Sequence, residues 1–151
     1  MLKCAPIITP DGIRDALDLA RDCYDALPNT TAEGRKSFAR ATDYSRVMGG
    51  IMAGELKLFG IGDPTLRGVA CTSQHGEHIM LLFVEDGYRG RRLGTALIET
   101  VMENARDEHI TRMTVNAEPD AVRFYEKFGF ETTSAAQERD GIAFVEMAAE
   151  I

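Results

Sequence analysis

A turn rich in glycine and arginine, within residues 84–97, holds the side chains whose types and spacing most clearly suggest chemistry. It connects the apolar run at 78–84 to a segment with helical periodicity. Unpaired N–H groups at a helix start attract anions with the help of the helix dipole, and glycine lets the backbone approach them closely. Arg89, Arg91 and Arg92 add positive charge, and their guanidinium groups match phosphate geometry. The turn therefore predicts a polyphosphate site, with an ordinary strand-to-helix turn that carries a solvated basic face as the alternative.

Two common nucleotide-binding motifs do not fit this turn. A nucleoside-triphosphate P-loop needs Lys and then Ser or Thr after its closing glycine, but Gly94 is followed by Thr95 and Ala96. A dinucleotide fingerprint needs the spacing G-x-G-x-x-G, whereas the glycines here stand at positions 87, 90 and 94. The sequence therefore favours a different polyphosphate ligand.

A second segment, at 116–130, begins with Asn116 and contains a distinctive spacing of small and aromatic residues. Its pattern A-x-x-F-Y-x-x-x-G-F is formed by Ala121, Phe124, Tyr125, Gly129 and Phe130. With these two segments in this order, the chain resembles the GCN5-related N-acetyltransferase (GNAT) superfamily, most closely over residues 55–147. The acetyl-CoA signature of that superfamily (Arg or Gln, two residues, Gly, one residue, Gly or Ala) maps onto residues 89–94, with Arg92 at its first glycine.

The resemblance implies an acetyl-CoA-dependent N-acetyltransferase that acts on a primary amine of a small molecule or protein by direct attack in a ternary complex. Acetyl-CoA is the implied co-substrate, and no metal is expected. A non-catalytic acyl-CoA-binding sensor or regulatory module is the alternative, and a protein for another nucleotide phosphate is a third hypothesis. The residues expected to bind the cofactor are Leu82, Phe83, Val84, Arg89, Gly90, Arg91, Arg92, Leu93, Gly94, Thr95, Asn116 and Tyr125.

The resemblance also implies catalytic roles. The backbone N–H groups of Leu82 and Val84 are expected near the acetyl carbonyl and the pantetheine arm. Tyr125, protonated at neutral pH, is the expected general acid, with a core aromatic residue as the alternative. His78 opens the central strand and is the expected general base because histidine titrates near neutrality. Glu77 or water could do the same work, and a hydrogen-bonded structural histidine is the alternative interpretation.

Other expectations concern the rest of the site. Asn116 is expected to contact the cofactor or order a water where two strands separate, or simply to end its strand. Tyr24, Phe38 and Tyr44 are expected near the acceptor, whose identity no motif specifies.

Composition sets the wider limits. The 151 residues, 44% hydrophobic, predict a single domain over residues 1–151 with a substantial core. The net charge of −7 disfavours nucleic acid as a partner. Without an apolar run of about 18 residues or a signal-like N-terminus, we expect no membrane partner and a cytoplasmic location. A homodimer is kept as a hypothesis.

The cysteines predict neither disulfides nor a metal site. Cys4, Cys23 and Cys71 are scattered and odd in number, as expected of reduced thiols. Cys71 lies near His75 and His78, but no fourth ligand is apparent, so no structural metal is expected there.

Periodicity and turn residues predict the order β-α-α-β-β-β-α-β-α-β-β. This is an α+β fold, implied by the resemblance to be the GNAT (acyl-CoA N-acyltransferase) fold, with helices flanking a mixed, mostly antiparallel twisted sheet. The expected elements are a strand at 5–9, a helix capped by Asp11, a helix at 32–53, a hairpin of 55–62 and 65–72, a strand at 78–84, a helix from 93 to 105, a strand at 112–116, a helix at 120–128, and strands at 131–136 and 142–147.

Overall fold

The computed structural model describes residues 3–88 and 92–151. In chain order its elements are β1 (Cys4–Pro6), α1 (Pro10–Asp25), α2 (Ala32–Ala41), α3 (Tyr44–Met52), β2 (Leu56–Ile61), β3 (Gly68–Ser73), β4 (His78–Val84), the 3-10 helix η1 (Asp86–Tyr88), α4 (Leu93–Asp107), β5 (Arg112–Ala117), the 3-10 helix η2 (Pro119–Ala121), α5 (Val122–Glu126), β6 (Glu131–Thr132), β7 (Gln137–Arg139) and β8 (Ile142–Glu150).

The strands form one mixed sheet, ordered β1-β2-β3-β4-β5-β8-β6, with β7 also paired to β8. Among the described residues, every pairing is antiparallel except the central one between β4 and β5. The predicted mixed, mostly antiparallel sheet is therefore confirmed. No helix in the described ranges is long and apolar enough to cross a membrane.

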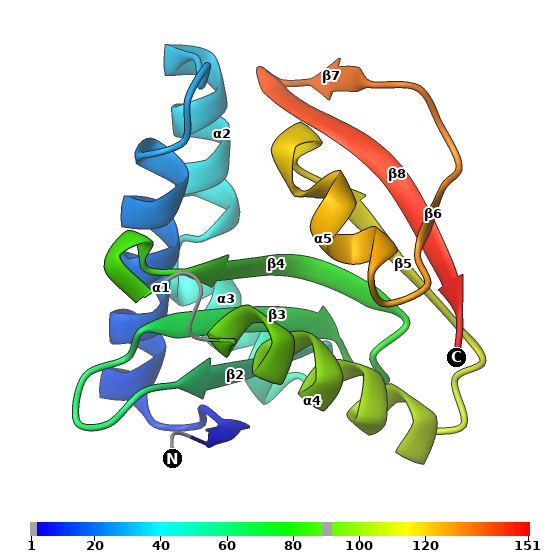
Figure 1. The fold of residues 1–151 in the computed structure, drawn as a ribbon. Coiled ribbons are helices and arrows are strands. Elements are labelled where there is room, and N and C mark those ends of the chain that lie inside the picture. The colour runs from blue at the N-terminus through cyan, green and yellow to red at the C-terminus, as the bar shows by residue number, and fades with distance from the viewer. Residues whose placement is uncertain (1–2, 89–91) are drawn as a thin grey trace.

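Helices cover both faces of the sheet (Figure 1). Helices α1 and α3 pack with β2, β3 and β4 around one apolar core that includes Ile13, Leu17 and Val69. Helix α4 packs on the opposite face around a larger core that includes Leu97 and Val101, and the aromatic residues of α5 belong to the same core. Alternate residues of β4 contribute to the two cores, as its nearly continuous apolar sequence predicts.

Three predicted helix boundaries were wrong for local reasons. Thr9, rather than Asp11, caps α1, because its hydroxyl accepts the N–H of Gly12 at 3.1 Å. The predicted helix at 32–53 is two helices, since Asp43 starts α3 by accepting the N–H of Arg46 at 3.2 Å. The predicted helix at 120–128 is the 3-10 turn η2 followed by the shorter α5.

The predicted strand at 131–136 was also wrong, because β6 ends at Thr132 and the next strand, β7, begins only at Gln137. Between them, the hydroxyl of Ser134 accepts the backbone N–H of Glu146 at 3.0 Å. A side chain thus replaces the backbone partner of β8 at this point and interrupts the ladder.

Candidate active site

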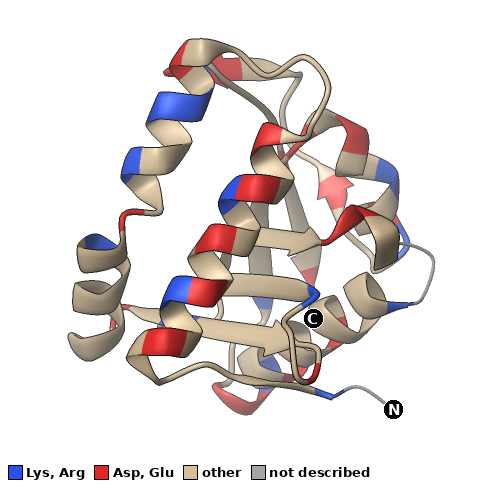
Figure 2. Ribbon diagram, turned by 90° about the vertical axis from the view of Figure 1, so that its left-hand side faces the viewer, with Lys and Arg blue, Asp and Glu red and all other residues tan. Residues whose placement is uncertain are grey.

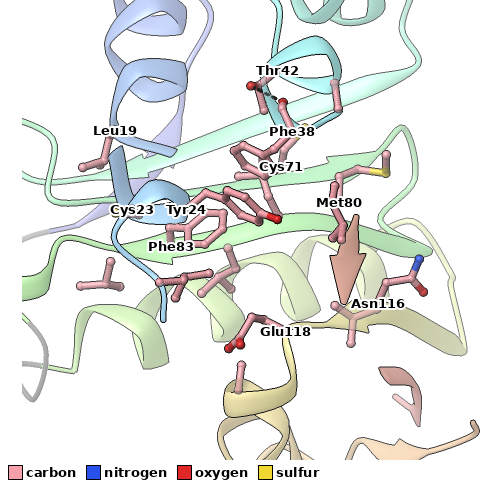
Figure 3. Close-up of a pocket in the computed structure, with 18 of the residues that line it drawn as sticks. Leu19, Cys23, Tyr24, Phe38, Thr42, Cys71, Met80, Phe83, Asn116 and Glu118 are labelled. Carbon is pink, nitrogen blue, oxygen red and sulfur yellow. Dashed lines mark hydrogen bonds between the residues drawn. The ribbon is translucent and has the colours of Figure 1, made fainter. Parts of the chain in front are cut away.

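The two central parallel strands separate partway along their length, and a cavity occupies the separation. Strands β4 and β5 are in register at His78 with Thr114 and at Ile79 with Val115, and no later described pair continues the ladder. The cavity has a volume of about 1260 Å³ and is lined from both faces of the sheet (Figure 3). Small-molecule sites are concave and mostly apolar with a few polar groups, so this is the candidate active site.

Beyond the separation, β4 directs backbone donors into the gap. The N–H of Glu85 donates to the carbonyl of Arg67, on the β3 side, at 2.7 Å. Because the N–H groups of an antiparallel strand alternate between its two edges, those of Leu82 and Val84 point to the other edge, toward β5. Both residues and Phe83 line the cavity. The N–H groups of Leu82 and Val84 therefore face the gap between β4 and β5.

Helix α4 begins at the same cavity. Leu93, Gly94 and Thr95 form its first turn and line the cavity together with Arg92. The N–H groups of a first helical turn lack partners within the helix and carry the positive end of its dipole. One cavity thus joins the donors of β4 to an anion-attracting helix start.

Arg92 has an unusual backbone conformation. Its φ of 62° lies in the left-handed region that glycine favours, and its side chain makes no capping hydrogen bond to α4. The family signature has its first glycine at this position, and the backbone geometry explains that preference. Three other residues expected to bind the cofactor, Arg89, Gly90 and Arg91, lie outside the described residues.

Tyr125 reaches the cavity from α5. Its side chain is 5% exposed, and its ring lies edge-on to Phe124 and Phe130, with centroids 5.2 and 5.5 Å away. Tyr125 is one of the residues that line the cavity. Burial raises the pKa of Tyr125, so the phenol is protonated at neutral pH and able to donate.

Asn116 lines the cavity from the opposite strand. It lies near the end of β5, where it pairs in register with Glu146 of β8, and its side chain is exposed (Figure 3). Asn116 is thus within the same cavity as the exposed amides of β4.

The structure does not bring His78 into this cavity. His78 lies where β4 and β5 are still paired, and its Nδ1 is 2.7 Å from the hydroxyl of Thr114. Burial lowers the pKa of His78, and the negative charge of Glu77 opposes the shift. Glu77 is also not among the described residues that line the cavity. A hydrogen bond from the side chain of Ser73 lowers the pKa of the Glu77 carboxyl group. The geometry therefore supports the structural interpretation of His78 rather than the predicted general base.

Aromatic side chains form the cavity wall on the α1 and α2 side. Tyr24 stacks on Phe38 with ring centroids 4.3 Å apart and planes 5° apart, and Phe38 meets Phe83 edge-on at 5.8 Å. Tyr24 and Phe38 were predicted near the acceptor, and both line the cavity. Tyr44 was also predicted there, but it lies beneath the guanidinium of Arg14 and outside the described lining.

Met80 and Glu118 are among the lining residues that sequence reasoning missed. Met80 has no pairing partner on β3, because Cys71 pairs with Leu81 and Thr72 pairs with Ile79. This β-bulge leaves Met80 54% exposed, and its side chain lines the cavity. Glu118 follows β5 and faces the aromatic wall across the cavity (Figure 3). In the sequence, Glu118 directly precedes Pro119, and proline is common at the first position of a helix. In the structure Glu118 caps η2, because its carboxylate accepts the N–H of Asp120 at 3.1 Å.

Two thiols, Cys23 and Cys71, also border the cavity. Burial raises the pKa of Cys71 to about 12, so this thiol is protonated at neutral pH and is a poor nucleophile. Among the described residues, no group of three or more His, Cys, Asp or Glu side chains is placed to hold a metal ion.

Charge is unevenly distributed around the site. Helix α1, which ends at the cavity, carries more acidic than basic side chains, with Arg14 and Arg21 between the aspartates (Figure 2): Asp11, Asp15, Asp18, Asp22 and Asp25. Asp22 lines the cavity.

Near the end of β4, the guanidinium of Arg67 pairs with Glu85 at 2.6 Å and lies 4.3 Å over the ring of Tyr88. The α1 side thus favours cationic ligands, whereas α4 begins with a positive helix end.

A family model described as an acetyltransferase (GNAT) domain matches residues 26–151. No curated protein sequence matches the chain. Among solved structures, a GCN5-related N-acetyltransferase from Rhodopseudomonas palustris matches with a TM-score of 0.82 and 20% identity, over 98% of this chain and 94% of that one.

Two further solved structures extend the comparison. The PaiA N-acetyltransferase from Thermoplasma acidophilum, in complex with coenzyme A, has a TM-score of 0.78 and 14% identity, over 100% of this chain and 99% of that one. The ribosomal-protein-S18-alanine N-acetyltransferase from Escherichia coli has a TM-score of 0.69 and 17% identity, over 100% and 94%. These similarities confirm the expected fold class.

Proposed function

Because this chain belongs to the GNAT acetyltransferase family, whose members use acetyl-CoA, we propose that it acetylates a primary amine by direct attack in a ternary complex. The observation that carries this proposal is one continuous cavity. It is lined by Leu82 and Val84 of β4, by the first turn of α4 and by Tyr125.

The residues present fit acetyl-CoA. A diphosphate suits the first turn of α4, at Leu93, Gly94 and Thr95, where N–H groups and the helix dipole favour anions. An extended amide-containing arm suits the separated edge of β4, because Leu82 and Val84 direct N–H groups into the gap. When bound, acetyl-CoA supplies an acetyl group activated as a thioester.

Leu82 and Tyr125 provide the two electrostatic functions that acyl transfer to an amine needs. The N–H of Leu82 donates to the acetyl carbonyl oxygen and stabilises the negative charge that develops there during attack. The phenol of Tyr125 donates its proton to the departing sulfur, and burial keeps that proton in place at neutral pH. Asn116 contacts the pantetheine region or orders a water in the gap.

The attacking ammonium must first lose a proton. His78 and Glu77 lie outside the described cavity lining, so the proposal assigns this step to water in the cavity. The raised pKa of Cys71 supports attack by the amine itself rather than an acyl-enzyme on that thiol. The excess of aspartates over arginines on α1 supports a cationic acceptor, because it attracts ammonium groups toward the cavity.

The alternative function is a CoA-binding sensor of the same fold without turnover. Two measurements test both functions together: thermal stabilisation by CoA, with ATP and NAD as comparisons, and release of the free CoA thiol from acetyl-CoA with an amine panel. Stabilisation with amine-dependent thiol release supports the enzyme. Stabilisation without turnover of any amine would favour the sensor, and no stabilisation by CoA would reject both.

A further inference from the structure

Helix α2 and the β7–β8 turn are joined directly across the acceptor side of the cavity. The hydroxyl of Thr31, the N-cap of α2, lies 3.2 Å from the carbonyl of Gly141, and the hydroxyl of Ser37 donates to the carbonyl of Asp140 at 2.7 Å. Figure 1 shows the turn lying beside the start of α2, at the end of the molecule away from the chain termini. We call this contact between 31–37 and 140–141 the bridge.

The bridge is a close backbone contact that needs glycine on both sides. A Cβ on Gly141 would come 2.5 Å from the backbone nitrogen of Gly34. A Cβ on Gly34 would meet the carbonyl of Gly141 and lie 2.9 Å from the hydroxyl of Tyr24. Asp140 and Gly141 have φ of 51° and 80°, as a tight Asp-Gly hairpin turn requires. The bridge is thus packed at van der Waals contact and extends to the aromatic wall.

Beneath the bridge, one part of the cavity wall is an apolar patch, while charged residues such as Arg40 and Arg139 line other parts of the cavity. The patch consists of the stack of Tyr24 on Phe38, the edge contact to Phe83, and neighbouring apolar side chains. Burial is the largest influence on the hydroxyl of Tyr24 and raises its pKa; the nearby charge of Arg35 opposes the shift. A group placed against this wall leaves water, which favours apolar groups and disfavours charged or strongly hydrated ones.

We propose that the acceptor is a small primary amine carried on an apolar, aromatic-sized body, and that the bridge encloses that body against the wall of Tyr24, Phe38 and Phe83. This inference rests on the proposed function, because it assigns the acceptor half of the same cavity. A polymer substrate would have to continue past the amine, and the bridge obstructs the chain on the α2 side. The bridge is the reason for proposing a small acceptor, and the aromatic wall is the reason for proposing an apolar one.

Release of free CoA thiol with four probe amines tests this assignment. The probes are 2-phenylethylamine, ethanolamine, spermidine and an alanine-initiated hexapeptide. Because burial of a phenyl group contributes about 1.5–3 kcal/mol, we expect kcat/KM for 2-phenylethylamine to exceed that for ethanolamine by about 10- to 100-fold. A preference for the peptide, for spermidine or for ethanolamine would overturn the proposal while leaving the acetyltransferase function intact.

Phe38→Leu tests the aromatic wall. It keeps an apolar side chain of similar reach but removes the ring contacts to Tyr24 and Phe83. We expect KM for 2-phenylethylamine to rise about two- to tenfold, with KM for acetyl-CoA unchanged. Phe59→Leu is the matched control, since Phe59 lies in the core on the α4 face of the sheet and outside the described lining, and it should change neither KM. Equal effects of the two variants on the amine KM would contradict the proposal.

Gly34→Ala tests the bridge, with Gly49→Ala as its control. Both glycines lie in helices, but an added Cβ meets nothing within 4 Å at Gly49 and meets Gly141 and Tyr24 at Gly34. We expect Gly34→Ala alone to reduce the preference for 2-phenylethylamine over the hexapeptide. Ser37→Ala, which removes one hydrogen bond of the bridge without adding a clash, should change that preference in the same direction. An unchanged preference in both variants would remove the bridge from the proposal.

Calorimetric titration of the CoA-loaded protein with the same amines separates the two proposals. Binding of 2-phenylethylamine without thiol release would support the assigned acceptor class and count against catalysis. Thiol release with other amines, without any binding of 2-phenylethylamine, would reject the acceptor class alone.

Discussion

The ring of Phe124 lies against Gly94, so that a Cβ on Gly94 would come 3.2 Å from Phe124 Cε1. This contact joins the two sequence motifs: Gly94 belongs to the first turn of α4, and Phe124 to α5 beside Tyr125. Because residue 94 has no side chain, the start of α4, where we propose that the diphosphate binds, can approach the aromatic motif closely.

We expect Gly94→Val to weaken CoA binding by about tenfold or more. The branched side chain adds methyl groups beyond a Cβ that already presses on Phe124, so the ring or the helix start must move. Thermal stabilisation by CoA over a range of concentrations measures the effect. Gly49→Val, in α3 with open space around it, is the control and should leave CoA affinity unchanged. Equal affinities for the two variants would show that this contact does not shape the cofactor site.

Arg92→Gly should raise the melting temperature. A non-glycine residue in the left-handed region costs about 1–2 kcal/mol, and the greater freedom of glycine in the unfolded chain offsets part of the gain. A net gain of about 1 kcal/mol corresponds to about 2–4 °C for a chain of this size. Arg92→Ala is the matched control, because it removes the same charge but retains the Cβ. If both variants melt at the same temperature, backbone strain at residue 92 is not the cause.

Tyr125→Phe should lower kcat by about 100-fold or more while leaving KM for acetyl-CoA near the wild-type value. The variant keeps the ring that packs on Phe130 and removes only the proton donor. Steady-state kinetics with any accepted amine measure the effect. Tyr44→Phe removes a hydroxyl outside the described lining and should not alter kcat. Wild-type turnover by Tyr125→Phe would exclude Tyr125 as the general acid.

His78 should contribute to the dependence of stability on pH. Burial lowers its pKa, so the folded state binds a proton less readily than the unfolded state, whose histidine titrates near 6.5. The stability associated with neutral His78 is complete above about pH 6.5 and is lost as the pH falls through that value toward the lower pKa of the folded state. We therefore expect the wild-type unfolding free energy to fall more on acidification than that of His78→Gln, as measured by denaturant titration.

The control for His78 is His109→Asn. His109 is exposed at the end of α4 with a φ of 64°, a conformation that asparagine tolerates. This variant should retain the wild-type acid dependence. The pH dependence of kcat/KM is an independent test. Because His78 lies outside the cavity, kcat/KM of His78→Gln should still fall at acidic pH as it does in the wild type. Disappearance of that fall would identify His78 as the general base and overturn the geometric interpretation.

Local sequence determined the two motifs and most of the elements between them. The apolar run of β4, the glycine and arginine turn, the spacing of α4 and the motif around Tyr125 depend on neighbours within a few residues, which periodicity reveals. Boundaries were less predictable, because capping depends on which of several polar side chains reaches a free N–H. Thr9 rather than Asp11, and Asp43 within a predicted helix, show this.

Tertiary structure alone decided which of these residues share the cavity. The bridge joins residues 110 positions apart in the chain, at Thr31 and Gly141, and no local pattern specifies such a contact. The same holds for His78: the sequence places it on the central strand, but the point where β4 and β5 separate determines that it pairs with Thr114 outside the cavity. Periodicity reports which face of an element is apolar, whereas the packing of distant elements determines what that face meets.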